Sequence, residues 1–166
     1  MEKLEINAPK ILSWDDLRQG MEVSLPLIIE QKDQNENDLR KCLYWLYKNN
    51  YKKISIVGAT GLRDDHSIAN IFSILEINTP LEIRIITDYG IFQIIENQNK
   101  LSSFKGQEVS LFTSNTTTKI TTKNLKYNLS SKSLKNHYLG TLNESIANKF
   151  YIKSNNGKIL LYTCHK

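Results

Sequence analysis

Residues 54–70 read ISIVGATGLRDDHSIAN, and this stretch decides the fold class. Its first four residues, Ile54 to Val57, form a short apolar run that predicts a buried strand, and glycines follow at once. Asp64 or Asp65 can start a helix whose buried side would carry Ile68, Ile71, Phe72 and Leu75. A strand, a glycine loop and a helix in this order predict an α/β layer.

The neighbouring segments continue this alternation of strands and helices. Upstream, Leu25 to Ile29 is typical of a strand start. Asn35 or Asn37 can cap a helix whose apolar face carries Leu39, Cys42, Leu43 and Leu46. Downstream, strands are predicted at Leu81 to Thr87 and Ile91 to Ile95, with a turn at 88–90. We therefore expect residues 1–100 to form a Rossmann-like layer with a parallel sheet.

The second half has a different pattern, with short strand candidates separated by polar turns. They are Val109 to Phe112, Lys119 to Thr122, Leu125 to Leu129, Lys149 to Lys153 and Ile159 to Thr163. Residues 154–158 read SNNGK, and Asn-Gly is the strongest short signal for a β-hairpin between the last two strands. We expect residues 101–166 to form an antiparallel β-sandwich.

The glycine loop has the chemistry of a phosphate site. Gly58, Thr60 and Gly61 would bring backbone N–H groups close to an anion, and the following helix start adds a partial positive charge. Arg63 can bind phosphate with two N–H groups, and Asp65 can position a metal ion or a hydroxyl. His66, Asn70 and Ser73 share one helix face. The alternative is a structural turn before an N-capped helix.

A second polar cluster, DQNENDLRK, spans Asp33 to Lys41 at another helix start. Asp33 and Asp38 could bind Mg²⁺, which prefers carboxylate and phosphate oxygens together, and Lys41 could reach a phosphate. The alternative is a charged helix start whose acidic side chains complement the helix dipole.

Taken together, the two clusters resemble the thiamine pyrophosphokinase family, in which a DQ[DN]xTDLxKA-like stretch precedes a GATGGRxDHxxxN motif. Thr87 to Gly90 also resembles a turn of bacterial members. Further on, Leu125 to Leu129 resembles the GLKYxL strand of the family, and Gly140 to Glu144 resembles its G-x-SNE turn. These blocks stand in the family's order.

The resemblance implies transfer of pyrophosphate from ATP to thiamine, with Mg²⁺ as cofactor, release of AMP and a homodimer. It implies catalytic roles for Asp38, Lys41, Arg63 and Asp65, and a Mg²⁺ site made by Asp33, Asp38 and Asp16. The remaining contacts divide into two sets. ATP or phosphate would be bound by Gln34, Asn37, Gly58, Thr60, Gly61, His66 and Asn70, and thiamine by Thr141, Leu142 and Asn143.

The sequence departs from the family pattern at several positions. It begins too late for the upstream glycine-rich DGG element, so the α/β domain is expected to be shortened. Asp15 and Asp16 lie near the place of the family's GDxDS acids, but they also fit a capped helix start. Leu142 replaces the thiamine-contacting serine, and Leu62 replaces a glycine. A non-catalytic relative that binds a nucleotide or thiamine phosphate is the alternative.

Composition restricts the other classes of function. No apolar run is long enough to span a membrane and no signal peptide is recognisable, so we expect a soluble cytoplasmic protein. Cys42 and Cys164 are expected to be free thiols. From residue 100 onward there are 11 lysines but only Glu108 and Glu144 as acids. A solvated lysine-rich surface is the simpler interpretation, and nucleic-acid binding is the alternative.

Overall fold

The computed structural model describes residues 35–166, and its helices and strands follow the predicted order closely. The helical part comprises α2 (Asp38–Lys48), α3 (Asp64–Glu76) and the 3₁₀ helix η1 (His137–Gly140). The strands are β1 (Lys53–Val57), β2 (Glu82–Ile86), β3 (Gly90–Ile95), β4 (Gln98–Ser102), β5 (Glu108–Phe112), β6 (Lys119–Lys123), β7 (Lys132–Ser133), β8 (Asn143–Glu144), β9 (Lys149–Ser154) and β10 (Ile159–Cys164). The strand predicted at Leu25 to Ile29 lies outside the described residues.

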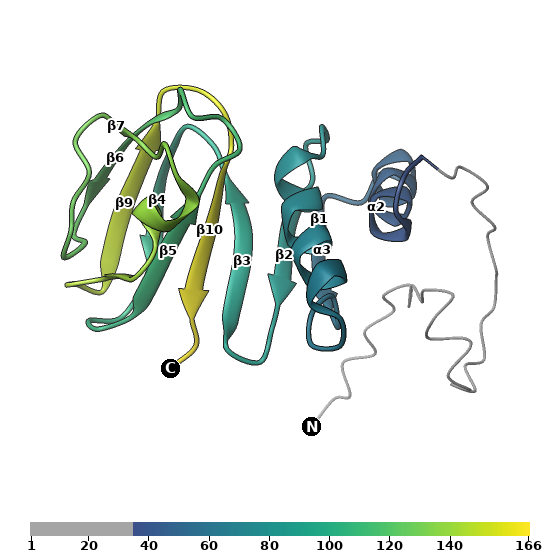
Figure 1. The fold of residues 1–166 in the computed structure, drawn as a ribbon, viewed down its shortest axis with the longest axis horizontal. Coiled ribbons are helices and arrows are strands. Elements are labelled where there is room, and N and C mark those ends of the chain that lie inside the picture. Colours follow the sequence, from purple (N-terminus) through teal and green to yellow (C-terminus); the bar gives the residue numbers. More distant parts are fainter. Residues whose placement is uncertain (1–34) are drawn as a thin grey trace.

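The strands form two sheets. The larger sheet has the order β1-β2-β3-β10-β5-β8, and the smaller has the order β4-β9-β6-β7. β1 and β2 are parallel, as predicted, whereas β3 turns back antiparallel to β2. Figure 1 shows the two helices beside one end of the larger sheet and the two-sheet sandwich at the other. The predicted fold class, an α/β layer followed by antiparallel β, is confirmed.

The C-terminal strand β10 joins the two halves, because it lies between β3 and β5 in the larger sheet. Its side chains alternate between two hydrophobic cores. Ile159 and Leu161 pack inside the sandwich with Phe150 and Ile152. Leu160 packs on the other face with Leu43 and with the other buried residues of the helices. One continuous sheet therefore contributes to both cores.

The predicted β9–β10 hairpin is wrong. β9 pairs with β4 and β6, whereas β10 pairs with β3 and β5, so residues 155–158 connect two different sheets. Gly157 does adopt a positive φ of 76°, as an Asn-Gly turn requires. Asn155 accepts a hydrogen bond from the Lys119 backbone N–H at 2.8 Å, which ties the connection to β6. The local turn signal was real, but the strand partners come from distant segments.

Three smaller expectations are also wrong. Residues 125–129 form a turn with a single bridge from Leu125 to Ser145, not a strand. Ile68 is 59% exposed, so it lies outside the buried face of α3. β1 is not buried, because it ends the order of the described strands and Val57 is 73% exposed. In contrast, the buried face of α2 is as predicted, with Leu43 and Leu46 in the interior.

Candidate functional site

The glycine loop lies at the carboxyl end of β1, where the sequence predicts it. Gly58 and Gly61 have φ values of +70° and +110°, which residues with a side chain rarely adopt. The Asn70 side chain donates to the Ala59 carbonyl at 3.0 Å and so holds the loop against α3. No atom lies within 4 Å of a Cβ built on either glycine, so the loop backbone is open to a ligand.

Arg63 and Asp65 form a two-point ion pair at the start of α3. The distances are 3.1 Å from Nε to Oδ1 and 2.5 Å from Nη2 to Oδ2. Both side chains are about two-thirds exposed, at 67% and 63%. The pKa of Asp65 is lowered to about 2, mainly by the Arg63 guanidinium and also by the His66 backbone N–H, which donates to the same carboxylate. The carboxylate is therefore ionised at neutral pH.

The start of α2 carries the second polar cluster. Asn37 is the N-cap, and its side-chain oxygen accepts from the Arg40 backbone N–H at 2.9 Å. Lys41 lies one turn inside the helix, and its Nζ is 3.2 Å from a carboxylate oxygen of Asp38. The Lys41 side chain is 11% exposed and that of Asp38 is 57% exposed, so the carboxylate faces solvent while the lysine stem is packed.

A hydrogen bond joins the two clusters. The Asn37 side chain donates to the Ser73 hydroxyl of α3 at 2.9 Å, although the residues are 36 positions apart. Ser73 lies about nine residues beyond the Asp64 start of α3, roughly 13 Å along the axis at 1.5 Å per residue. The start of α2 therefore meets the middle of α3 rather than its first turn.

The two sandwich motifs are also held together, through Asn143. Its side chain accepts from the Tyr127 N–H at 3.0 Å and donates to the Tyr127 carbonyl at 2.8 Å. The backbone N–H of Lys126 donates to the Glu144 carbonyl at 2.8 Å. Asn143 is 8% exposed, so its amide supports the 125–129 turn from inside the protein.

Leu142 is the most exposed residue of the 140–144 turn, at 84%. Its φ is +58°. This left-handed conformation is strained for any residue other than glycine, and the strain costs free energy. Its neighbour Gly140 is tightly enclosed, because an added Cβ would lie 2.1 Å from the Leu111 carbonyl oxygen. Thr141 donates its hydroxyl to the Tyr138 carbonyl at 2.8 Å. The turn is rigidly built yet presents an apolar side chain to solvent.

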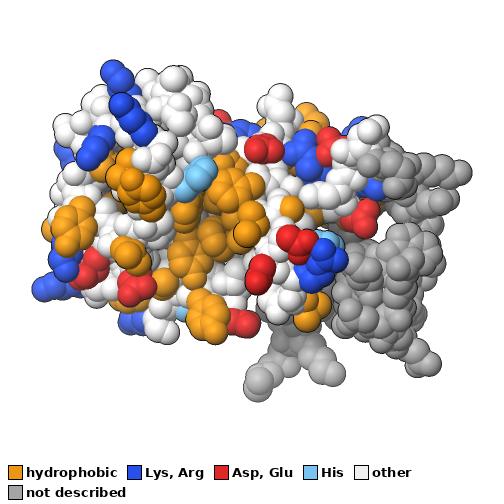
Figure 2. Space-filling model, in the orientation of Figure 1, with side chains coloured by type: hydrophobic (Ala, Val, Ile, Leu, Met, Phe, Trp, Pro, Cys, Tyr) orange, Lys and Arg blue, Asp and Glu red, His pale blue; other side chains and the backbone are white. Residues whose placement is uncertain are grey.

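An aromatic contact links η1, which leads into this turn, to α3. The ring of His137, in η1, lies edge-on to Phe72 of α3, with the ring centroids 5.5 Å apart. On the neighbouring sheet surface, Phe92 of β3 and Tyr162 of β10 have ring centroids 4.5 Å apart. Figure 2 shows apolar side chains gathered on this face, between the sandwich and the helices. The predicted thiamine turn therefore connects through one aromatic contact to α3, which begins just after the predicted phosphate loop.

Two family models match the chain. Residues 15–87 match "Thiamin pyrophosphokinase, catalytic domain", and residues 90–162 match "Thiamin pyrophosphokinase, substrate-binding domain". The chain belongs to the thiamine pyrophosphokinase family. The two matches meet between residues 87 and 90, just before β3, whereas the domain boundary expected from the sequence pattern is at residue 100.

Solved structures share the fold of the family. Thiamine pyrophosphokinase from Bacillus subtilis aligns with a TM-score of 0.67 and 22% identity, over 81% of this chain and 65% of that chain. The Geobacillus thermodenitrificans enzyme gives 0.69 and 21%, over 93% and 74%. The Candida albicans enzyme gives 0.61 and 16%, over 75% and 51%. This chain thus spans just under two thirds of the Bacillus subtilis protein. Among curated proteins no significant match is found.

Three of the predicted family residues, Asp16, Asp33 and Gln34, lie outside the described residues. Of the predicted Mg²⁺ ligands only Asp38 is described, and within residues 35–166 no group of three acidic, histidine or cysteine side chains forms a metal cluster. An exposed Asp38 carboxylate does fit Mg²⁺, which commonly takes one or two carboxylates together with substrate phosphates.

Some contacts around the site could not have been found from the sequence. The His137–Phe72 contact spans 65 positions, and no local pattern marks it. The Lys158 ammonium donates to the carbonyl of Ile77, the C-cap of α3, and lies 3.8 Å from Glu96. Lys158 thereby ties the connection between the sheets to the end of the helix.

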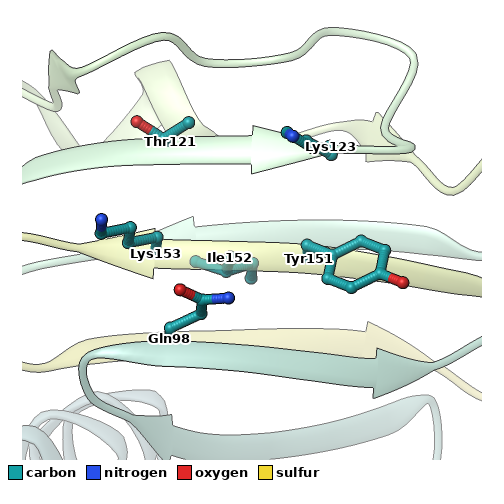
Figure 3. A pocket seen from close by; sticks show the side chains of 6 residues that line it. All are labelled: Gln98, Thr121, Lys123, Tyr151, Ile152 and Lys153. Carbon is teal, nitrogen blue, oxygen red and sulfur yellow. The ribbon is translucent and has the colours of Figure 1, made fainter.

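The sandwich also has an open hollow of about 470 Å³ on the outer face of β4, β6 and β9, shown in Figure 3. Its lining residues are Gln98, Thr121, Lys123, Tyr151, Ile152 and Lys153. None of them belongs to a family motif, so the hollow is separate from the predicted thiamine and phosphate residues.

Proposed function

We propose that this chain transfers the pyrophosphoryl group of ATP to thiamine, which gives thiamine diphosphate and AMP. The observation that carries the proposal is the exposed Arg63–Asp65 pair beside the open Gly58–Gly61 loop, in a chain of this family. An exposed ion pair contributes little to stability, so Arg63 can exchange the carboxylate for a phosphate at small cost. Before a phosphate binds, the ion pair with Asp65 holds the Arg63 guanidinium beside the loop.

The residue roles in this proposal follow from charge and position. Arg63 and the loop N–H groups would stabilise the negative charge of the transferring phosphates. Asp38 would hold the Mg²⁺–phosphate group, and Lys41 would add positive charge once Asp38 has turned to the metal. Bound Mg²⁺ neutralises phosphate charge. The thiamine hydroxyl oxygen attacks the β-phosphorus and loses its proton to water. The bond between the β-phosphorus and the oxygen that bridges it to the α-phosphorus breaks, and AMP leaves with that oxygen.

The thiamine side of the proposal rests on residues 140–144. Thr141 and Leu142 are exposed enough to contact a ligand, whereas Asn143 would act by holding the 125–129 turn in place. A homodimer and a cytoplasmic location complete the proposal. The dimer is supported by strongly exposed apolar side chains, among them Leu142 at 84%, Tyr89 at 79% and Tyr138 at 70%. In the described residues no helix is long and apolar enough to cross a membrane.

The test is AMP release from ATP and Mg²⁺, with and without thiamine. Thiamine-dependent AMP is expected from the native chain and no turnover from Asp38→Asn. The matched control is Glu76→Gln, which removes an exposed carboxylate from the last turn of α3, away from the motifs. If Asp38→Asn turns over as fast as the native chain, the proposed role of Asp38 in binding Mg²⁺ is wrong.

One observation favours binding without turnover. Leu142 has no hydroxyl, so it cannot replace the hydrogen-bonding group of the serine that contacts thiamine in the family. It is also held in a positive-φ conformation. If no AMP forms, a thermal-shift screen with ATP and thiamine diphosphate decides between this alternative and loss of the site. A raised melting temperature supports the non-catalytic relative, because a ligand that binds only the native state stabilises it.

A further inference from the structure

Five lysines point outward from the smaller sheet and define what we call the lysine face: Lys100 on β4, Lys119 and Lys123 on β6, and Lys149 and Lys153 on β9. All five are exposed. The residues that alternate with them, such as Phe150 and Ile152, point into the sandwich core. The pleat of the sheet therefore directs the lysines to solvent, and neither α2 nor α3 covers them (Figure 1).

Strand pairing places two of these lysines, Lys100 and Lys123, on either side of one aromatic ring. Tyr151 on the central strand β9 is the direct partner of Lys100 on one side and Lys123 on the other. The Lys100 ammonium lies 5.5 Å from the Tyr151 ring centre. In the next row, Lys153 stands between Gln98 and Thr121. Figure 3 shows Gln98, Thr121, Lys123, Tyr151 and Lys153, from three neighbouring strands, around the hollow.

Charge is separated between the two sheets. The only two acids after residue 99, Glu108 and Glu144, are paired in register on β5 and β8 of the other sheet. Among the described residues, none of the five lysines has an ion-pair partner, whereas Lys126 and Lys158 on other parts of the sandwich do. Like charges on neighbouring strands repel one another. A bound polyanion would relieve this repulsion.

We propose that the lysine face binds single-stranded nucleic acid, RNA or DNA, without sequence preference. Lysines meet phosphates as point charges, and the face has no arginine to read bases bidentately. Tyr151 supplies a ring on which a base can stack, and Gln98 and Thr121 supply hydrogen-bonding groups. From Lys149 to Lys153 the strand rises about 13 Å, which gives an extended strand room for a few nucleotides.

Other occupants fit the face less well. None of the large apolar side chains that are exposed in the described residues lies on the outer side of β4, β6 or β9, so a lipid surface would gain charge attraction without apolar insertion. The lysine face of a second copy of the chain would be repelled, because both faces are positively charged. A duplex keeps its bases paired and stacked inside, so Tyr151 would have no free base face on which to stack.

The first experiment is fluorescence anisotropy of labelled oligo(dT) and oligo(U), about a dozen nucleotides long, titrated with the full chain. If all five lysines contact phosphates, the log–log salt slope is about −3.5, and affinity falls roughly a hundredfold between about 50 and 200 mM salt. Vesicles of neutral lipid with an added anionic lipid are the second probe. Binding to vesicles without binding to oligonucleotides would overturn the proposal, as would no binding at low salt.

Matched variants separate this face from net charge. Lys123→Gln with Lys153→Gln is expected to reduce the salt slope by about 1.4, because two phosphate contacts are lost. Lys48→Gln with Lys52→Gln changes net charge equally but lies near the end of α2, so oligonucleotide affinity should stay close to native. An equal loss in both pairs would mean that general positive charge binds the oligonucleotide, and the proposal would be wrong.

The aromatic contact has its own control. Tyr151→Leu should weaken oligonucleotide binding about fivefold or more at constant salt, which is the loss of one base stack, and should leave the salt slope unchanged. Tyr47→Leu, at a 40% exposed tyrosine of α2, should have no effect. Circular dichroism checks that each variant is folded. None of the substituted residues belongs to the proposed kinase site, so AMP release tests that function separately.

Discussion

Arg63 and Asp65 show how one largely exposed side chain can shift the pKa of another. Neither residue is buried, yet two N–H groups directed at one carboxylate lower the pKa of Asp65 to about 2. The pairing extends the pH range in which Asp65 is ionised downwards and holds the guanidinium in place. Desolvation acts in the opposite direction and raises the pKa, but the local ion pair two residues apart outweighs it.

Replacing Arg63 with Ala should raise the pKa of Asp65 towards its ordinary value of about 3.9. Because the native pKa lies below the unfolded one, any stability that the pair adds is present above about pH 4 and is lost as pH falls towards 2. NMR titration of the carboxyl carbon measures the shift. Arg84→Ala, an exposed arginine on β2, should leave the Asp65 pKa unchanged. An unchanged pKa in Arg63→Ala would show that another group holds the carboxylate.

Leu142 is held in a backbone conformation that suits glycine better than leucine. Its φ of +58° is strained, which destabilises the folded state. At 84% exposure the side chain buries too little apolar surface to offset this strain. The substitution Leu142→Gly should therefore raise the free energy of unfolding by about 0.5–1 kcal/mol in urea titrations. Leu139→Gly, in η1 and without a positive φ, should lower it. A loss of stability in both variants would contradict the strain at Leu142.

The contact between α2 and α3 shows how a cap can also orient an element. Asn37 caps α2 through its side-chain oxygen and binds Ser73 of α3 through its nitrogen. One side chain thereby fixes both where α2 begins and which part of α3 it meets. The sequence predicts the cap, because Asn is a preferred N-cap residue, but not its partner.

Replacing Asn37 with Ala should lower the free energy of unfolding by about 1–2 kcal/mol, because the cap and the Ser73 bond are lost together. Ser73→Ala alone removes only the bond between the helices. In a double-mutant cycle, the two changes should couple by roughly 0.5–1 kcal/mol. Additive losses would mean that the 2.9 Å contact adds nothing beyond the cap.

At the level of the whole molecule, β10 makes the α/β half and the sandwich share one sheet. Leu160 is buried in the helix-side core and Leu161 in the sandwich core, although they are adjacent in sequence. If β10 separates from either half, apolar surface of both cores becomes exposed. We therefore expect residues 35–166 to unfold in a single cooperative step.

Leu160→Ala and Leu161→Ala should each lower the free energy of unfolding by about 2–5 kcal/mol, since both leave cavities at fully buried sites. Calorimetry should show one transition in both variants. Far-ultraviolet circular dichroism and tryptophan fluorescence should report the same midpoint. Two separated transitions, with each variant shifting only one, would show that the halves unfold independently.

The sequence alone determined the features that depend on neighbours along the chain. The buried face of α2, its cap by one of Asn35 and Asn37, most strands and the order of the family motifs follow from periodicity, local hydrogen bonding and short-range glycine geometry. It also predicted the Gly58–Gly61 loop at the end of β1. These features need few distant contacts to be stable, so local patterns are enough to identify them.

Only the tertiary structure decided how the segments pair. The Asn-Gly turn at 156–157 predicts a hairpin, yet the sandwich places β9 and β10 in different sheets. The 125–129 segment reads as a strand, yet Asn143 holds it as a turn. The placing of Lys100 and Lys123 beside Tyr151 depends in the same way on strand register. Pairing is settled by burial of both cores and by hydrogen bonds between distant residues, which no local pattern specifies.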